Sequence, residues 1–388
     1  MKTTSRFFSS VASIVAVGSI ACGQSCTPTL VTTFDTPGTA WDVFVVGSTA
    51  YVADAASGLQ IFDVSNPASP VAIGSYAAAV GAGRVVVQDE IAFVCRGSAG
   101  VDLVDVTDPT APALLSTFPS PFGSSIVSVK VVGTTMYVAD WPTHFLVVDI
   151  ADPTQPSLLG MADTGFSDDV FVEGAFAYVI NATFAGSVDV FDVTVPTNPS
   201  FYSGFITTQS NGSVTEVAAP YIYNAEWEHG FRVYDMTLPP NSAPVGELSI
   251  PQNQFYSSGL SSLGSLVALS SSDDASLREV KIISVADPSD PFIMGQVDVP
   301  APPHRSIISG GFVFVCLGDA GVSIIDISTC QQACYADCDE SGALTIFDYI
   351  CFGNAYAGNE PYADCDNSGS LNVFDYICYG NAYAAGCP

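Results

Sequence analysis

The sequence predicts an all-β seven-bladed β-propeller followed by a small α-helical domain. The first observation is a long repeat: the segment YVADAASGLQIFDVSNPASP, from Tyr51 to Pro70, recurs six more times in variant form at steps of 42 to 49 residues. The second is a change after Cys330, where a shorter repeat with a 27-residue step begins. A unit of about four short strands cannot bury both faces alone, so such units stack around an axis.

Each long repeat is punctuated by an acidic residue before a proline-rich turn. Aspartate and asparagine side chains accept backbone hydrogen bonds in such turns, and proline presets the backbone angle. We therefore expect a structural role for these residues, and seven copies predict seven blades. The marker residues are Asp63, Asp105, Asp149, Asp192, Asp235, Ser284 (which replaces the aspartate) and Asp326.

The composition excludes some classes of partner. The chain of 388 residues has 9 Lys and Arg against 39 Asp and Glu, a formal charge of −30. Such a charge repels nucleic-acid phosphates and anionic lipids, so no nucleic-acid role is expected. A hydrophobic content of 48% excludes a disordered chain.

The first 23 residues have the form of a secretory signal peptide. Lys2 and Arg6 precede an apolar run that ends in small residues. Cleavage after Gly23 leaves ten of the eleven cysteines, an even number that suits an oxidising compartment. Lipoprotein processing at Cys22 is the alternative. No later segment has the apolar length of a transmembrane helix, so a secreted or cell-surface location is expected.

The propeller is expected to span residues 24–329 and to close through its own N-terminus. The last repeat lacks a fourth strand, while residues 28–34 match residues 70–76 of the first repeat. The N-terminal segment is therefore expected to complete blade seven. This alignment brings Cys26 to Cys330 across the seam, where a disulfide is predicted. Cys95 and Cys316 lie two blades apart, too far for direct bonding, and are expected to be buried thiols.

Polar residues recur where the strands open on one face, around the expected central channel. At the ends of the second strands stand Asp54, Arg96, Asp140, Asn181 and Glu226. At the starts of the inner strands we expect Asp42, Arg84, Ser128, Asp169, Glu216 and Arg305, with Trp41, Trp141, Trp227 and His304 nearby.

Two interpretations of these residues are open. The first is inter-blade ion pairing that fixes the ring, and the second is a polar ligand site for a glycan or peptide, in which aromatic rings stack on the ligand. The candidate ligand-binding residues are Asp42, Arg84, Asp169, Glu216, His304 and Arg305.

Signatures of enzymes are few. His144, His229 and His304 lie in different repeats without metal-ligand spacing, and no nucleophile elbow or phosphate-binding loop stands in a suitable context. A carboxylate pair such as Asp42 with Asp169 would suit a glycosidase or lyase, because those reactions use paired carboxyl groups. No catalytic residue is assigned.

The long repeat resembles the LVIVD-repeat family of secreted propellers. The resemblance lies in the motif Y-V-A-D followed by G-[LV]-x-[IV]-[FV]-D-[VI]-x-[DN]-P, and it covers most of residues 27–329. It is clear in five repeats and poorest in the sixth, around residues 261–291. The resemblance implies an architecture and a compartment but no chemistry.

Residues 330–388 contain two loops of EF-hand type, each followed by a helical sequence. ADCDESGALTIFDYICFGNAYA from Ala336 is matched by ADCDNSGSLNVFDYICYGNAYA from Ala363. Calcium prefers such oxygen ligands, so two calcium sites are predicted, with vestigial loops as the alternative. The ligand positions are Asp337, Asp339, Ser341, Ala343, Thr345 and Asp348 in the first loop and Asp364, Asp366, Ser368, Ser370, Asn372 and Asp375 in the second.

These paired units resemble the cysteine-bearing dockerin modules, over residues 334–388. The resemblance implies calcium-dependent attachment to a cohesin-like or other cell-surface anchoring protein. Where dockerins usually place hydroxyl-bearing recognition residues, the chain has Ile346-Phe347 and Val373-Phe374. We expect Phe347 and Phe374 to pack the two halves of the module together instead of contacting a partner.

The module's six cysteines permit 15 pairings. The repeated positions suggest two equivalent disulfides and a clasp between the module's ends. These pairs are Cys338 with Cys351, Cys365 with Cys378, and Cys334 with Cys387.

Three functions follow from these patterns. The first is a non-catalytic secreted propeller that binds a ligand and is anchored by the C-terminal module. The second is an enzyme acting on polysaccharide, and the third is a purely structural surface protein. Carboxylates converging in the channel would favour the second, and a channel closed by ion pairs would favour the third.

Overall fold

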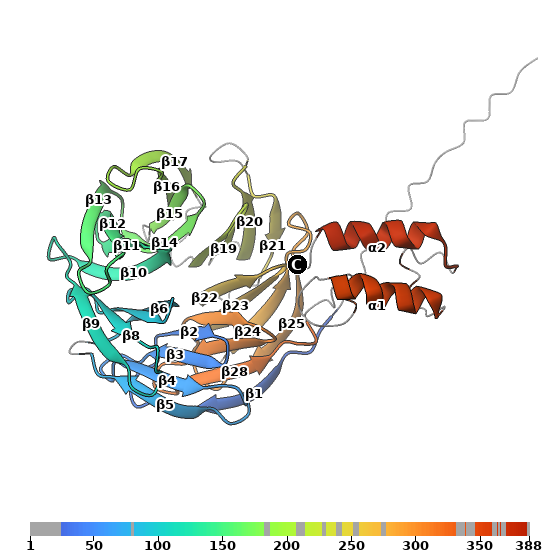
Figure 1. Cartoon of the computed structure of the whole chain (residues 1–388), viewed down its shortest axis with the longest axis horizontal. Helices are drawn as coiled ribbons and strands as arrows, with labels where there is room; N and C mark the ends of the chain where they lie inside the picture. The colour runs from blue at the N-terminus through green and yellow to red at the C-terminus, as the bar shows by residue number, and fades with distance from the viewer. Residues whose placement is uncertain are drawn as a thin grey trace, which may run out of the picture.

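The computed structural model describes residues 25–78, 81–181, 187–206, 214–226, 230–237, 243–250, 256–272 and 277–330, and then 338, 346–358, 363, 365 and 370–385. Within these residues the strands form seven four-stranded antiparallel sheets arranged around an axis (Figure 1). The seven-bladed propeller predicted from the repeat is confirmed. The predicted signal peptide lies outside the described residues.

In the first four blades the strands follow one another from the axis outward, in chain order. Blade one comprises β2 (Asp42–Val46), β3 (Thr49–Ala53), β4 (Leu59–Asp63) and β5 (Val71–Tyr76). Blade two comprises β6 (Arg84–Gln88), β7 (Ile91–Cys95), β8 (Val101–Asp105) and β9 (Ala113–Phe118). Blade three comprises β10 (Ser125–Val132), β11 (Thr135–Trp141), β12 (His144–Asp149) and β13 (Ser157–Asp163). Blade four comprises β14 (Ser167–Glu173), β15 (Phe176–Asn181), β16 (Ser187–Asp192) and β17 (Ser200–Ile206).

The remaining blades keep this order until the last strand of blade seven, which comes from the start of the chain. Blade five comprises β18 (Val214–Ala218), β19 (Tyr221–Glu226), β20 (Gly230–Asp235) and β21 (Gly246–Leu248). Blade six comprises β22 (Tyr256–Leu263), β23 (Leu266–Ser272), β24 (Arg278–Ser284) and β25 (Phe292–Asp298). Blade seven comprises β26 (Ser306–Ser309), β27 (Phe312–Cys316), β28 (Val322–Asp326) and β1 (Thr29–Phe34).

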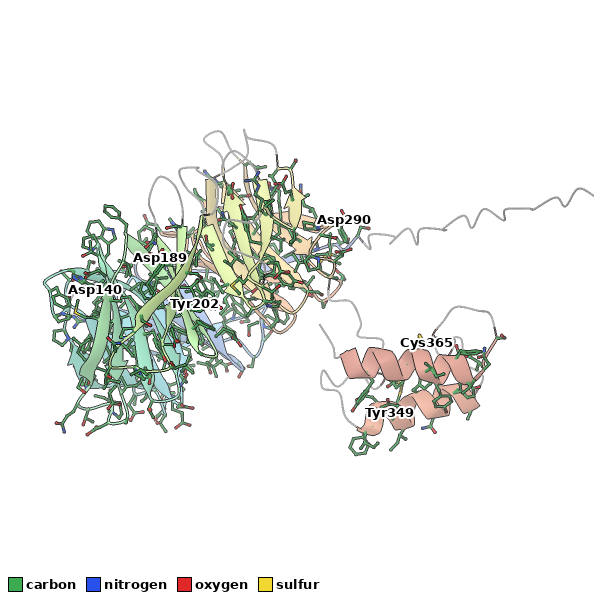
Figure 2. The ribbon with its side chains drawn as sticks, turned by 90° about the horizontal axis from the view of Figure 1, so that it is seen from above. Asp140, Asp189, Tyr202, Asp290, Tyr349 and Cys365 are labelled. Atoms are coloured by element: carbon green, nitrogen blue, oxygen red, sulfur yellow. A yellow bond between two sulfur atoms is a disulfide. The ribbon has the colours of Figure 1, made fainter. Side chains whose placement is uncertain are left out.

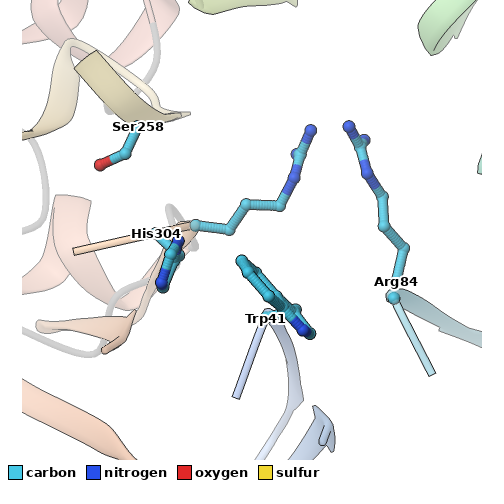
Figure 3. A pocket seen from close by; sticks show the side chains of 6 residues that line it. Trp41, Arg84, Ser258 and His304 are labelled. Atoms are coloured by element: carbon cyan, nitrogen blue, oxygen red, sulfur yellow. The ribbon is translucent and has the colours of Figure 1, made fainter. Parts of the chain in front are cut away.

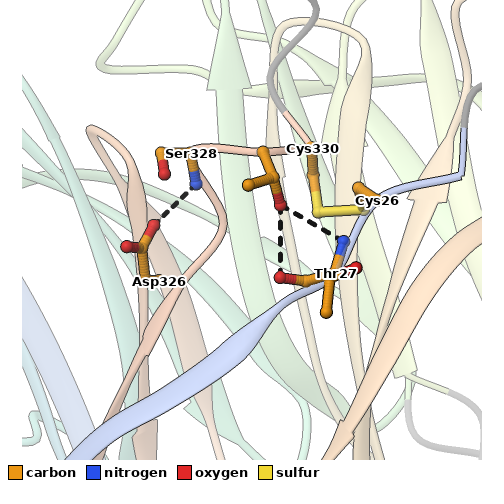
Figure 4. The surroundings of a disulfide bond; sticks show 6 residues. Cys26, Thr27, Asp326, Ser328 and Cys330 are labelled. Carbon is orange, nitrogen blue, oxygen red and sulfur yellow. Dashed lines mark hydrogen bonds between the residues drawn. A yellow bond between two sulfur atoms is a disulfide. The ribbon is translucent and has the colours of Figure 1, made fainter.

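The seam in blade seven is closed as predicted. Strand β1 pairs with β28 in antiparallel register from Thr29 opposite Asp326 to Phe34 opposite Val322. A disulfide joins Cys26 to Cys330 beside this pair, across 304 residues of chain (Figure 4). The backbone N–H of Thr27 also donates to the hydroxyl of Thr329. The two ends of the propeller are therefore joined by both hydrogen bonds and a covalent bond.

The blades pack face to face through apolar side chains. One buried cluster lies between blades two and three and includes Phe93, Leu103, Met136 and Leu146. A comparable cluster fills each of the other six boundaries between the described parts of neighbouring blades. Cys95 and Cys316 are buried in two of these clusters as free thiols, which confirms the prediction.

The repeated aspartates have the structural role predicted for them. The carboxylate of Asp63 accepts the backbone N–H of Ser65 at 2.8 Å, and Asp105 accepts that of Thr107 at 2.9 Å. In blade six the hydroxyl of Ser284 accepts the equivalent N–H at a longer 3.4 Å. These bonds hold the turn that leads into the fourth strand.

The C-terminal residues form helices α1 (Ile346–Ala357) and α2 (Val373–Ala385). Disulfides join Cys338 to Cys351 and Cys365 to Cys378, two of the pairs suggested by the repeat. Cys334 and Cys387 lie outside the described residues. No helix among the described residues is long and apolar enough to span a membrane.

Rings from both helices pack against each other. Phe352 stacks on Tyr379 with ring centroids 4.0 Å apart. Tyr349, which lies between the two helices in Figure 2, meets Tyr379 edge to face. Phe347 and Phe374 are instead 64% and 63% exposed. The suggestion that these two rings pack the halves together is wrong, because neither belongs to the described apolar core between the helices.

Candidate functional site

Each blade places one residue, in or next to its inner strand, at the same level near one end of the central channel. We call this set the mouth ring. Its members occupy equivalent positions in the registers of the first and second strands of their blades. The mouth ring consists of Asp42, Arg84, Ser128, Asp169, Val214, Gly259 and Arg305.

Asp169 is the centre of an ion-pair network across this ring. Its carboxylate is 2.5 Å from the guanidinium of Arg84 and 3.0 Å from that of Arg305, which come from blades two and seven. The Ser128 hydroxyl donates to it at 2.5 Å, and the backbone N–H of Val170 donates at 2.9 Å. Blades two, three, four and seven are therefore tied together across the channel.

The network fixes the charge states of its members. Burial alone would raise the pKa of Asp169, but the guanidiniums of Arg84 and Arg305 hold it well below its usual range. For Asp42 burial prevails and raises the pKa, although both arginines and the N–H of Val85 oppose the shift. Asp169 is therefore a fixed anion, and it is unsuited to donate a proton as a general acid.

Glu216 lies deeper than predicted. It pairs with Tyr223 in the blade-five register, as Phe44 pairs with Tyr51 in blade one, so it occupies the second level of the channel. Val214 takes the mouth position instead. Burial inside the channel, and then the charge of Asp169, raise the pKa of Glu216 to about 7. The channel cavity between these levels has a volume of about 150 Å³.

Above the channel lies a second cavity of about 350 Å³, which we call the mouth pocket (Figure 3). Trp41 is 42% exposed there and packs edge-on against the His304 ring, with centroids 4.5 Å apart. Burial lowers the pKa of His304 despite the nearby charge of Asp319, so the imidazole is neutral at pH 7. The pocket is lined by Trp41, Gly83, Arg84, Ser258, His304 and Arg305.

The residues at the ends of the second strands do not line the channel, which corrects the prediction. Arg96 is buried against Asp102 at 2.6 Å, and Glu226 is buried against Arg232 at 3.1 Å. Asp54 accepts bonds from Thr36 and Gly38. The second strand lies one strand farther from the axis, so its end is covered by loops.

The other predicted aromatic and histidine residues are spread more widely. Trp141 lies near Phe166, with centroids 6.4 Å apart, and His144 stacks on Phe122. None of these four lines the mouth pocket. Trp227 and His229 lie outside the described residues.

One channel residue and one residue of the mouth pocket were missed by the sequence analysis. Lys130 lines the channel cavity two residues after Ser128, and its charge opposes the rise in the pKa of Glu216. Ser258, at the mouth pocket, precedes Gly259. The period of two along a strand could have revealed Lys130, since Ser128 was already assigned to the channel.

At the C-terminus the structure describes only part of each candidate calcium loop. Asp348 and Asp375, at the last loop position, are buried in the first turn of their helices. Asp375 accepts the backbone N–H of Asn372 at 2.6 Å, and Asn372 accepts that of Phe374 at 2.9 Å. Outside the described residues lie Asp337, Asp339, Ser341, Ala343, Thr345, Asp364, Asp366 and Ser368.

The fold and the repeated sheets define a β-propeller repeat protein. The family model of the LVIVD repeat matches residues 37–78, 81–119, 125–164, 165–207 and 306–330, so the chain carries LVIVD repeats in blades one to four and seven. Blades five and six, the weaker copies, are not matched. No curated protein matches the chain.

Among solved structures, the chain is similar to the computationally designed Ika8 protein. The match has a TM-score of 0.59 and 9% sequence identity, and it covers 77% of this chain and all of that one. At this identity the likeness concerns the fold alone.

Proposed function

We propose that this chain is a secreted or cell-surface binding protein without catalytic activity, which holds a ligand in the mouth pocket. The observation that carries the proposal is the pocket itself. An exposed Trp41, a neutral His304 and a part-exposed Arg305 converge there from blades one and seven. Binding sites combine an apolar surface with a few polar groups in this way.

The enzyme alternative receives less support. A glycosidase needs one carboxyl group that is protonated at working pH. Asp169 cannot fill that role beside two guanidiniums. Asp42 and Glu216 have raised pKa values, but they line the channel cavity of about 150 Å³ and not the mouth pocket. The ion pairs also partly support a purely structural role for the protein. Arg84 is only 15% exposed and bonds to both Ser128 and Asp169. We assign Arg84 mainly to the ring and Arg305 to the ligand.

A glycan and peptide array read with the full chain tests this proposal. Trp41→Ala should abolish whatever binding the wild type shows, because it removes the exposed face of the pocket. Trp141→Ala is the matched control, since Trp141 is similarly exposed but lies outside the pocket. Unchanged binding by Trp41→Ala, with loss in Trp141→Ala, would refute the mouth pocket as the binding site.

We further propose that the C-terminal helices form a dockerin-like module that binds calcium and anchors the chain. Asp348 and Asp375 support it, since each is buried where a loop meets its helix. The disulfides from Cys338 and Cys365 hold the start of each loop against that helix. The loop oxygens named in the sequence would hold the ion, and calcium would neutralise the clustered carboxylates.

The exposed apolar residues at the helix starts support a protein partner for this module. Ile346 and Phe347 on α1 have equivalents in Val373 and Phe374 on α2, and all four are exposed. Exposed apolar patches of this kind commonly mark interaction surfaces. We propose a cohesin-like or other anchoring protein of the cell surface as the partner.

Capture of envelope proteins by the full chain, with calcium and with a chelator, tests the anchoring function. A partner should be retained only with calcium. The double variant Phe347→Ser with Phe374→Ser should lose the partner, whereas Phe201→Ser, at an equally exposed ring on the propeller rim, should retain it. Equal capture by both variants would exclude the helix faces as the contact.

A further inference from the structure

We infer that the mouth pocket takes a single carboxylate-bearing sugar residue, with Arg305 bound to the carboxylate and Trp41 stacked on the ring. The inference rests on the proposed binding function and names its ligand class. Three features of the pocket support it: the N–H groups of Arg305 that are not bonded to Asp169, the exposed ring of Trp41, and the backbone N–H groups that are already hydrogen-bonded.

Arg305 supplies the open donors. A guanidinium has five N–H groups. Among the described residues, the guanidinium of Arg305 donates one hydrogen bond, from Nη2 to Asp169. Its side chain is 33% exposed. Arg84, by contrast, bonds to Ser128, Asp168 and Asp169. Arg305 is therefore the cation that can receive an anion without breaking the ring network.

The charge of the described pocket lining also favours an anionic ligand. Arg84 and Arg305 line it, and no described carboxylate does. The carboxylates of Asp42, Asp169 and Glu216 line the channel beneath. The whole chain has a charge of −30, which repels a polyanion at long range. A ligand with one local negative charge fits this combination better than a polyuronate.

The wall of the pocket fits a sugar ring. Trp41 is exposed and is held by its edge-on contact with His304, so its free face is preorganised. The neutral imidazole and the Ser258 hydroxyl can exchange hydrogen bonds with sugar hydroxyls. A volume of about 350 Å³ suits one such residue and its linkage.

The backbone of the pocket disfavours the other common carboxylate, a peptide C-terminus. Proteins capture that group with clustered backbone N–H donors. Here the N–H groups of Trp41, Gly83 and His304 are already bonded to carbonyls of Ala53, Cys95 and Cys316. At these three residues the pocket therefore offers no free backbone N–H group for a nest.

Gly259 sets the shape of this site. A Cβ at Gly259 would lie 2.7 Å from the carbonyl oxygen of His304 and 3.1 Å from the Cα of Arg305. Such contacts are too short, so a larger residue must displace the segment that holds both side chains. Gly259→Ala is thus a variant that moves Arg305 without removing its charge.

Calorimetry of the full chain with short glycans tests the inference. The probes are oligosaccharides ending in glucuronate or galacturonate and their matched neutral forms ending in glucose or galactose. At least one acidic form should bind at least about tenfold more tightly than its neutral form, because a charged hydrogen bond is added. Arg305→Gln should remove that difference, and Gly259→Ala should weaken acidic binding. Arg278→Gln, an equal charge change outside the pocket, should leave binding unchanged.

Each other outcome overturns the inference. Equal affinity for acidic and neutral forms, with loss in Trp41→Ala, would leave the mouth pocket as a binding site but exclude a carboxylate. An acidic preference that survives Arg305→Gln would exclude Arg305 as its receptor. No binding of any acidic probe, or binding of a peptide through its C-terminal carboxylate instead, would exclude the sugar class.

Discussion

Breaking the disulfide between Cys26 and Cys330 is expected to destabilise the propeller measurably. The bond closes 304 residues of chain. For a loop of that length the chain-entropy relation gives about 6 kcal/mol, whereas measured disulfides typically contribute about 2–4 kcal/mol. We expect the lower range, because β1 also keeps its hydrogen bonds to β28 in the variant.

The double variant Cys26→Ser with Cys330→Ser should therefore unfold about 4–8 °C below the wild type, at about 2 °C per kcal/mol for a domain of this size. Scanning calorimetry under oxidising conditions measures the difference. The control is Cys338→Ser with Cys351→Ser, which removes a disulfide beside α1 and should leave the propeller transition unchanged.

Under reducing conditions the wild type and the seam variant should unfold together, since neither then has the bond. Equal transitions under oxidising conditions would refute the reasoning that the seam needs covalent closure. Peptide mapping that found Cys26 bonded within the C-terminal module would refute the pairing itself.

Three further predictions concern the channel and the module. Because burial raises the pKa of Glu216 to about 7, its protonated form favours folding, so stability should fall as pH rises from about 4.5 through 7. Glu216→Gln should flatten that fall in urea titrations, and exposed Glu173→Gln should not. Arg84→Gln should cost about 1–3 kcal/mol in urea unfolding and Arg84→Lys less, because only the former removes the charge beside Asp169; equal losses would exclude that pairing. Added calcium should increase helical signal and protease resistance, whereas Asp348→Ala should weaken one site; calorimetry without calcium binding to the oxidised chain would exclude both sites.

Most of the propeller was predictable because its repeat is punctuated by turn chemistry. Asp63 and its equivalents mark the same turn in each blade, so counting them counted the blades. The match of residues 28–34 to an outer strand also identified the seam. Because residues 28–34 share the motif of the outer strand, aligning them with residues 70–76 also fixed the position of Cys26. That alignment placed Cys26 beside Cys330.

The site was less predictable than the fold. The alternation of side chains along a strand shows which face of the sheet a residue lies on, but not how deep in the channel it lies. Residues two apart on a strand face the same side, so Glu216 was assigned to the correct face and the wrong level. Alignment of the repeats likewise placed the ends of the second strands at the central channel. In the structure such an end is covered, and Arg96 is buried there. The exposure of Phe347 could not be predicted because it depends on how α1 and α2 pack.

We propose that the chain binds its ligand at the channel mouth. Hydrogen exchange of the full chain, with and without a ligand that binds it, measures this most directly. Residues 40–43, 82–85 and 304–306 should gain protection, because they hold Trp41, Arg84 and Arg305. Protection confined to the outer strands, with none in these three segments, would contradict the claim.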